Sequence, residues 1–261
     1  MQIQQIRNAT LRLRFGGATF LIDPWLAEQG AMGTFAQTPY RCMRPEAERI
    51  PMPMLPLPCS VAAICSGIDA IVLTHVHPDH IDMAEDGTVG KPLPKEVPLF
   101  VQNVDDAVTC QRSGFDDVTV LYENSAFGGV SLIKTPARHG TKIPCGSACG
   151  VVFQAEGEKT LYLVGDSIWY EGVRQTLERF HPAVIVVNAC GAHLLSYGRL
   201  IMDAQDIALL HAACPDATIV ISHMDCVAHA TVTRSAMRAF LDEHALTKYC
   251  VMPEDGASLD L

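Results

Sequence analysis

Four residues of metal-binding type fall within six positions of this chain, in the run His75-Val76-His77-Pro78-Asp79-His80. The run directly follows an apolar stretch, Ala70–Thr74, whose composition is typical of a buried strand. His75 and His77 alternate, so in extended geometry both side chains point to the same side. Pro78 cannot continue a strand ladder and forces the chain to turn. Because imidazole and carboxylate together suit zinc, manganese or iron, the run predicts a metal site at the end of a strand.

Other His and Asp residues follow later stretches that are also typical of strands. His139 comes after 130–135, Asp166 after 161–164 and His223 after 219–221. Residues at the ends of strands lie in the loops that carry binding and catalytic groups on a rigid scaffold. The sequence therefore predicts that these side chains join the first run in one site.

The pattern of apolar segments sets the fold class. The first strands form a hairpin around Gly16-Gly17, whereas later strands alternate with helices, and this mixture favours two sheets covered by helices. A chain of 261 residues suits a large α/β sandwich formed as one unit, 1–261. Strands are predicted at 9–15, 18–22, 70–74, 98–101, 118–121, 130–133, 150–153, 160–164, 183–187 and 218–221, and helices near 102–113, 170–179, 203–213 and 232–244.

Residues 27–60 have a different texture, with many prolines and little periodicity. Long irregular segments of compact domains are often functional, so the segment is predicted to be a lid or a wall of the site. An inert excursion packed on the surface is the alternative.

The order of the candidate ligands resembles the metallo-β-lactamase superfamily, whose hallmark is H-x-H-x-D-H followed by later His, Asp and His residues. The resemblance extends from about residue 9 to 230. It implies a four-layer αβ/βα sandwich with two divalent ions per chain, zinc or manganese first and iron third. The implied ligands are His75, His77 and His139 for the first ion and Asp79, His80 and His223 for the second, with Asp166 bridging.

The resemblance also implies a reaction. A hydroxide between the two ions would attack a small ester, lactone or phosphoester, with Asp79 and Asp166 as the catalytic carboxylates. Asp23, in Ile22-Asp23-Pro24, matches the family's early Asp and would support a ligand histidine; capping the turn before Pro24 is the alternative. A metal-binding or redox scaffold of the same fold, without hydrolysis, is the other function considered.

Within the superfamily, the chain is similar to the branch that contains L-ascorbate-6-phosphate lactonase, on Asp23-Pro24-Trp25, Gly165-Asp166-Ser167 and Ile221-Ser222-His223-Met224. Flavo-diiron members usually carry Glu where this chain has His77, so oxygen reduction is disfavoured. Many true β-lactamases carry Cys where Asp166 stands here. The resemblance to lactonase-like relatives favours a homo-oligomer.

Five residues are candidate substrate contacts, each with an ordinary structural alternative. Trp169 and Tyr170 would wall the pocket or pack in the core, and His229 would reach the substrate from beyond His223. Asn188 would donate a hydrogen bond or form a turn. Arg138 would meet an anionic substrate group or pair with a surface acid.

Composition narrows the partners. A net charge of −10 with no basic run argues against a nucleic-acid substrate, so a small molecule, anionic groups included, is expected. No apolar run approaches the length of a membrane span, and the N-terminus lacks the pattern of a signal peptide, so a cytoplasmic location is expected. The ten cysteines form no paired framework, and Cys145 and Cys149 are expected to serve packing or loop structure rather than a metal.

Overall fold

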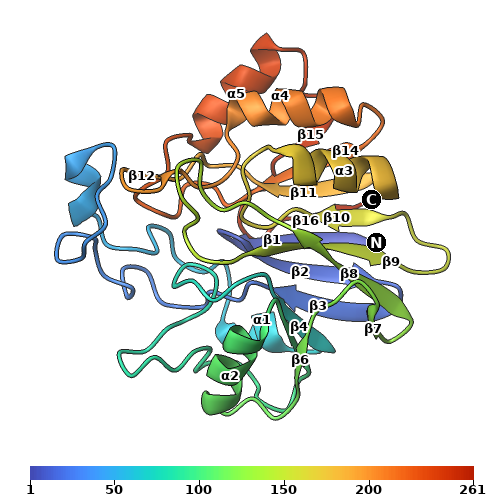
Figure 1. The fold of residues 1–261 in the computed structure, drawn as a ribbon, viewed down its shortest axis with the longest axis horizontal. Helices are drawn as coiled ribbons and strands as arrows, with labels where there is room; N and C mark the ends of the chain where they lie inside the picture. Colours follow the sequence, from blue (N-terminus) through green and yellow to red (C-terminus); the bar gives the residue numbers. More distant parts are fainter.

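The computed structural model describes all residues, 1–261, and places most strands in two seven-stranded sheets that lie face to face (Figure 1). In spatial order, the first sheet contains β16 (Ser258–Asp260), β1 (Gln2–Arg7), β2 (Thr10–Phe15), β3 (Ala18–Ile22), β4 (Ala70–Leu73), β5 (Leu99–Val101) and β6 (Val118–Val120). The second contains β15 (Cys250–Val251), β14 (Thr218–Ser222), β11 (Val184–Asn188), β10 (Leu161–Leu163), β9 (Cys149–Gln154), β8 (Val130–Pro136) and β7 (Ser125–Phe127). A small hairpin joins β12 (His193–Leu194) to β13 (Gly198–Arg199).

Helices cover the outer face of each sheet (Figure 1). The short α1 (Val61–Cys65) and α2 (Val104–Arg112) lie on the first sheet, and α3 (Glu171–Phe180), α4 (Ala204–Ala213) and α5 (Arg234–Glu243) lie on the second. Side chains at the N-caps of α2, α4 and α5, namely Asn103, Asp203 and Thr233, accept hydrogen bonds from backbone N–H groups of the first turn. Each such cap stabilises a helix by about 1 kcal/mol.

The strand side chains alternate between two apolar layers. In β4, Ala70 and Val72 pack between the sheets, whereas Ile71 and Leu73 pack toward α1 and α2. Strand β11 divides its side chains in the same way, between the inter-sheet core and the core beneath α3 to α5. A sheet that is apolar on both faces must be covered on both faces. The prediction of a four-layer αβ/βα sandwich is confirmed.

Each strand and helix predicted from the sequence is present. Strands β1, β7, β12, β13, β15 and β16, helix α1 and a 3-10 helix at Pro45–Arg49 were not predicted. Most are only two to six residues long, too short for a periodic pattern to stand out. Strand β16 brings the C-terminal residues beside the N-terminus, where it pairs with β1. None of the helices combines the length and apolar character needed to cross a membrane.

The 27–60 segment is tied at both ends to the first strand. Arg7 is fully buried, and its guanidinium donates to the carbonyl oxygens of Trp25 at 2.9 Å, Ala27 at 2.9 Å and Leu55 at 3.1 Å. Its guanidinium also stacks on the Trp25 ring at 5.1 Å. Because a guanidinium offers five donors in a fixed fork, one side chain holds the start and the end of the segment together.

The interior of the segment packs into the core of the second half of the molecule. Phe35, Cys42 and Met52 are buried there, and Cys42 forms an isolated β-bridge with Leu194 of the small hairpin. The segment is therefore a packed part of the molecule rather than a projecting loop.

Candidate metal centre

The predicted ligands come from strands whose ends meet at one edge of the two sheets. Strands β3 and β4 run parallel in the first sheet, and β10, β11 and β14 run parallel in the second. Strand β8 runs in the same direction as β10, because each is antiparallel to β9. The loops that follow these strands therefore reach the same edge, and all the predicted ligands lie in those loops.

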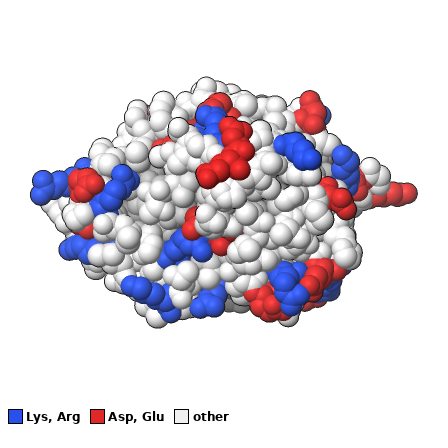
Figure 2. All heavy atoms as spheres, turned by 90° about the horizontal axis from the view of Figure 1, so that it is seen from above, with Lys and Arg blue, Asp and Glu red and all other residues white.

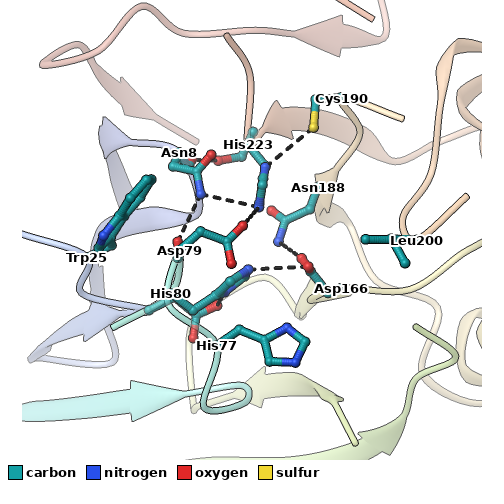
Figure 3. Close-up of polar contacts among 12 residues, drawn as sticks. Asn8, Trp25, His77, Asp79, His80, Asp166, Asn188, Cys190, Leu200 and His223 are labelled. Carbon is teal, nitrogen blue, oxygen red and sulfur yellow. Dashed lines mark hydrogen bonds and ion pairs between the residues drawn. The ribbon is translucent and has the colours of Figure 1, made fainter. Parts of the chain in front are cut away.

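The structure brings the seven predicted ligands into three interlocking groups. Figure 3 shows His77, Asp79, His80, Asp166 and His223 among them. Each group offers donor atoms that lie within 4.8 Å of one another. The groups are His75, His77 and His139; Asp79, His80 and His223; and His75, His80 and Asp166, which shares a histidine with each of the other two. The first two match the ligand sets implied by the family resemblance.

The outward nitrogens of three ligand histidines face fixed acceptors. His139 Nδ1 donates to the Leu200 carbonyl oxygen at 3.1 Å. His75 Nδ1 lies 3.1 Å from Thr74 Oγ1. Because that hydroxyl donates its own proton to Asp23 Oδ2 at 2.8 Å, it accepts a hydrogen bond from the imidazole. His80 Nδ1 lies 3.0 Å from Asp23 Oδ2. Acceptors on the outer nitrogens leave the inner ones unprotonated, as metal ligation requires.

Asp23 is the common support of His75 and His80. It is 1% exposed, and its other oxygen accepts from the Thr74 backbone N–H at 2.7 Å. The carboxylate thus faces the histidine run, and it is the Asp23 backbone oxygen that accepts from the following turn, at Trp25 N. This geometry fits the supporting role better than the turn-capping alternative.

The inner atoms form an arrangement that a cation would stabilise. His75 Nε2 and His77 Nδ1 face each other at 3.0 Å, and His80 Nε2 lies 3.3 Å from Asp166 Oδ2. Two unprotonated ring nitrogens repel at that distance unless a positive charge lies near both. The donor set of imidazole and carboxylate suits zinc and manganese, so the residues fit two divalent ions.

The electrostatics of the centre agree with this fit. Burial, followed by the neighbouring His139, lowers the pKa of His77 to about 4. Burial also acts to lower the pKa of His80, but the carboxylates of Asp166 and Asp23 outweigh it and raise that pKa to about 10. Burial acts to raise the pKa of Asp166, yet His80 holds it well below its ordinary range. The centre thus keeps its carboxylate ionised and favours positive charge.

Asn8 is a site residue that the sequence reasoning missed (Figure 3). Its amide donates to the Asp79 backbone oxygen at 2.9 Å and lies 3.2 Å from His223 Nε2. On the other side of the ring, His223 Nδ1 lies 3.5 Å from Cys190 Sγ. Asn8 has φ of 54° in the tight turn between β1 and β2, a conformation that Asn tolerates better than most residues. In the sequence, the one hint of a special position is an Asn just ahead of the strand at 10–15, because Asn adopts left-handed backbone more readily than most residues.

The predicted substrate contacts have different surroundings. Asn188 is buried, and its amide donates to Asp166 Oδ1 at 2.7 Å, which is the geometry of a positioning residue rather than of a substrate contact. Arg138 is exposed and donates to the Thr141 carbonyl oxygen. Trp169 and Tyr170 are half-buried and pack beside the core beneath α3.

Replacing Asn188 with alanine should weaken metal binding about tenfold, because Asp166 would lose the donor that fixes its outer oxygen. Competition with a chromogenic chelator measures the affinity. Asn103→Ala, which removes a helix cap whose side chain bonds to Asp106 N and to none of the ligands, should lower stability by about 1 kcal/mol and leave the metal affinity unchanged. Equal metal affinity in Asn188→Ala and the unaltered chain would contradict the positioning role.

None of the cysteines is a candidate metal ligand, although Cys190 contacts the ligand His223. All ten are free, and none belongs to the three ligand groups. Cys149 is buried between the sheets in β9, and Cys145 is half-buried in the loop after His139. The expectation of packing or loop roles agrees with these positions.

Comparison with known families adds an independent observation. The model of the β-lactamase superfamily domain matches residues 18–224, a range that includes every candidate ligand. The chain belongs to the metallo-β-lactamase superfamily. The prediction from the order of the His and Asp residues is thereby confirmed, whereas the L-ascorbate-6-phosphate lactonase branch is not singled out and stays a prediction.

Two known proteins resemble the chain over its whole length, and a third resembles it over part of it. UPF0173 protein YddR of Bacillus subtilis is 38% identical over 262 residues, covering 99% of each chain. A UPF0173 metal-dependent hydrolase of Methanosphaerula palustris is 33% identical over 162 residues, which cover 59% of this chain and 66% of that protein. The crystal structure of an isothiocyanate hydrolase from Delia radicum gut bacteria superimposes with a TM-score of 0.90 at 35% identity, covering 100% of this chain and 99% of the other. The chain is thus a member of a family of metal-dependent hydrolases.

Proposed function

We propose that this chain is a two-metal hydrolase of a small molecule with an electrophilic carbon or phosphorus. The observation that carries the proposal is the set of three interlocking ligand groups, in which the outer nitrogens of His75, His80 and His139 face acceptors. His75, His77 and His139 would hold one ion, Asp79, His80 and His223 the other, and Asp166 would bridge them. Zinc or manganese suits this donor set, with iron third.

When bound, two such ions supply a hydroxide at neutral pH and polarise the substrate oxygen, sulfur or nitrogen. Asp79 and Asp166 are the carboxylates of the centre, and they differ in access. The Asp79 side chain is 13% exposed, whereas that of Asp166 is 4% exposed. Asp79 is therefore placed to take the proton of the attacking water and return it to the leaving group, while Asp166 stays a structural bridge. Both sheets supply ligands, which supports one hydrolase unit over 1–261.

Among the substrate groups, we place the isothiocyanate first, ahead of ester, lactone and phosphoester. The support is the full-length similarity to the isothiocyanate hydrolase. In that reaction water adds to the central carbon of R–N=C=S, and the carbon–nitrogen bond breaks. The nitrogen takes both protons and leaves as R–NH₂, and the carbon leaves as O=C=S. Asp79 would carry one of those protons.

The surface is compatible with a small-molecule substrate. On the face seen in Figure 2, above α4 and α5, Lys and Arg side chains stand among Asp and Glu side chains. They do not gather into a basic patch there. A phosphate backbone requires such a patch, so that face offers nothing to a nucleic acid.

Metal analysis combined with substrate profiling tests the proposal. The purified chain is expected to hold two ions, and chelation is expected to abolish turnover that zinc or manganese then restores. The panel contains isothiocyanates, carboxylic esters, lactones and phosphodiesters. Fewer than two ions per chain together with no metal-dependent turnover across the panel would favour the non-hydrolytic scaffold instead.

A further inference from the structure

Four aromatic side chains from three distant parts of the chain form a contiguous group, here called the mouth cluster: Phe35, Tyr40, Tyr197 and His229. Ring centroids lie 5.3 Å apart between Phe35 and His229, 5.9 Å between Phe35 and Tyr40, and 6.3 Å between Tyr40 and Tyr197. Phe35 and Tyr40 come from the 27–60 segment, Tyr197 from the β12–β13 turn, and His229 from the loop after β14. Such edge-on aromatic contacts hold rings in defined positions.

The inner end of the mouth cluster reaches the metal centre through His229. That ring is 9% exposed, and its Nδ1 has no hydrogen-bond partner. Burial lowers the pKa of His229 to about 4 despite the opposing charge of Asp79, so the ring lies within the field of the centre. A buried ring nitrogen that has no partner within the protein is free to bind a ligand atom.

The outer end of the mouth cluster reaches the same centre by a second route. Burial, followed by the Asp79 and Asp166 charges, raises the pKa of the Cys145 thiol to about 11. The Tyr40 pKa is raised by burial, then by Tyr197 and Cys145. The backbone contacts agree with this: the Cys145 N–H donates to the carbonyl oxygen of His139 at 2.6 Å, and the Tyr197 carbonyl oxygen accepts from the Lys142 N–H at 2.9 Å in the same loop. The outer end of the mouth cluster is therefore joined to the loop that follows the candidate ligand His139.

Tyr40 also presents its ring to the outside. It is one of the few large hydrophobic side chains with substantial exposure, at 37%, whereas Phe35 behind it is 7% exposed. Exposure within the cluster therefore falls from Tyr40, at its outer end, to Phe35 and His229, which are buried. An apolar group that entered along this gradient would exchange water for aromatic contact.

We propose that the mouth cluster binds the apolar substituent of the substrate, so that this hydrolase prefers substrates with an aryl or long alkyl group on the reacting function. The inference rests on the proposed hydrolysis. Tyr40 and Tyr197 are the specificity-determining residues at the outer end, and Phe35 forms the inner wall. His229 Nδ1 lies where a polar atom at the root of that substituent would meet it.

A different location for the substituent is a polar depression of about 650 Å³ that is lined in part by His139. Its lining includes Lys134, Arg138 and Tyr122. Charged groups make that surface a poor receptor for an apolar group, because their desolvation costs free energy. Tyr122 is 59% exposed and serves as a matched tyrosine for comparison with Tyr40.

The test compares kcat/KM for methyl, butyl and benzyl isothiocyanate, with the acetates of the matching alcohols as a second series. The metal-loaded chain is expected to gain about fourfold for each methylene that the mouth cluster covers. Tyr40→Ala and Tyr197→Ala should each reduce the benzyl-to-methyl ratio by about tenfold, and Tyr40→Phe should restore it. Tyr122→Ala should leave the ratio unchanged. Circular dichroism verifies that each variant is folded.

Two results would overturn the inference: an equal loss on methyl and benzyl substrates in Tyr40→Ala, or a change of the ratio in Tyr122→Ala instead. If no substrate in either series, and no lactone or phosphodiester, shows metal-dependent hydrolysis, the proposed function fails by itself. The mouth cluster is then judged by binding of benzylamine and methylamine in titration calorimetry. Tighter binding of benzylamine that is lost in Tyr40→Ala would support the cluster, and equal binding would reject it.

Discussion

Asp166→Ala should reduce turnover about a thousandfold and leave the chain unable to hold two ions. Asp166 is the shared carboxylate of the centre, 3.3 Å from His80 Nε2 and within ion-pair distance of His75 and His139. Removing it deletes a negative charge that both ions would share, and several kcal/mol of electrostatic stabilisation correspond to about three powers of ten in rate. Metal content by plasma emission spectroscopy and kcat/KM on the best substrate measure the two effects.

The matched control for Asp166 is another buried carboxylate. Asp206 on α4 is 5% exposed and pairs with Arg199 rather than with any of the ligands. Asp206→Ala should lower stability, because it removes one of the two carboxylates that pair with the Arg199 guanidinium, yet it should keep two ions per chain. Two ions and full activity in Asp166→Ala would refute the assignment of the bridge.

Asp23→Asn should weaken metal binding by about ten- to a hundredfold and leave partial activity at saturating metal. Asparagine keeps the size of the side chain and tolerates the left-handed backbone at this position, where φ is 42°. It removes the charge that faces His80 Nδ1 and one of the two oxygens that accept from Thr74. Loss of such outer partners typically costs that much metal affinity.

The shape of the Asp23→Asn result separates support from ligation. Loss of a supporting residue lowers the metal affinity, so added zinc should restore part of the lost kcat. Loss of a ligand, in contrast, is not compensated by added zinc. Asp69→Asn is the control, because Asp69 Oδ2 accepts from the Thr19 N–H in a similar backbone contact but far from the ligands. Unchanged zinc affinity in Asp23→Asn would show that His75 and His80 are oriented by other groups.

The residues that cluster at the candidate metal centre could be predicted from sequence because their positions are encoded locally. Each follows a strand, and the strand is recognisable from a few apolar residues. The direction of the strands then brings their ends together, so a one-dimensional order becomes a three-dimensional site. Asp23 could be placed for the same reason, as it follows β3 directly.

The supporting contacts could not be predicted, because they depend on packing between segments far apart in the chain. Asn8 reaches His223 across 215 positions, and Asn188 reaches Asp166 across 22. Neither residue belongs to a motif, and an Asn at the end of a strand is equally consistent with a turn. The mouth cluster was missed for the same reason, since no periodicity links Phe35 to Tyr197.

Because Arg7 binds both ends of the 27–60 segment, the residues between those ends are structurally separate from the metal ligands. The candidate metal ligands follow the ends of strands, whereas Phe35 and Tyr40 of the mouth cluster belong to the 27–60 segment. The Arg7 guanidinium binds both ends of that segment. Substitutions between those two ends can therefore change the residues proposed to bind the substrate without changing the metal ligands. Replacing the interior of the 27–60 segment with that of a relative, while Arg7 and the residues whose carbonyl oxygens it binds are retained, should therefore transfer the relative's substrate range.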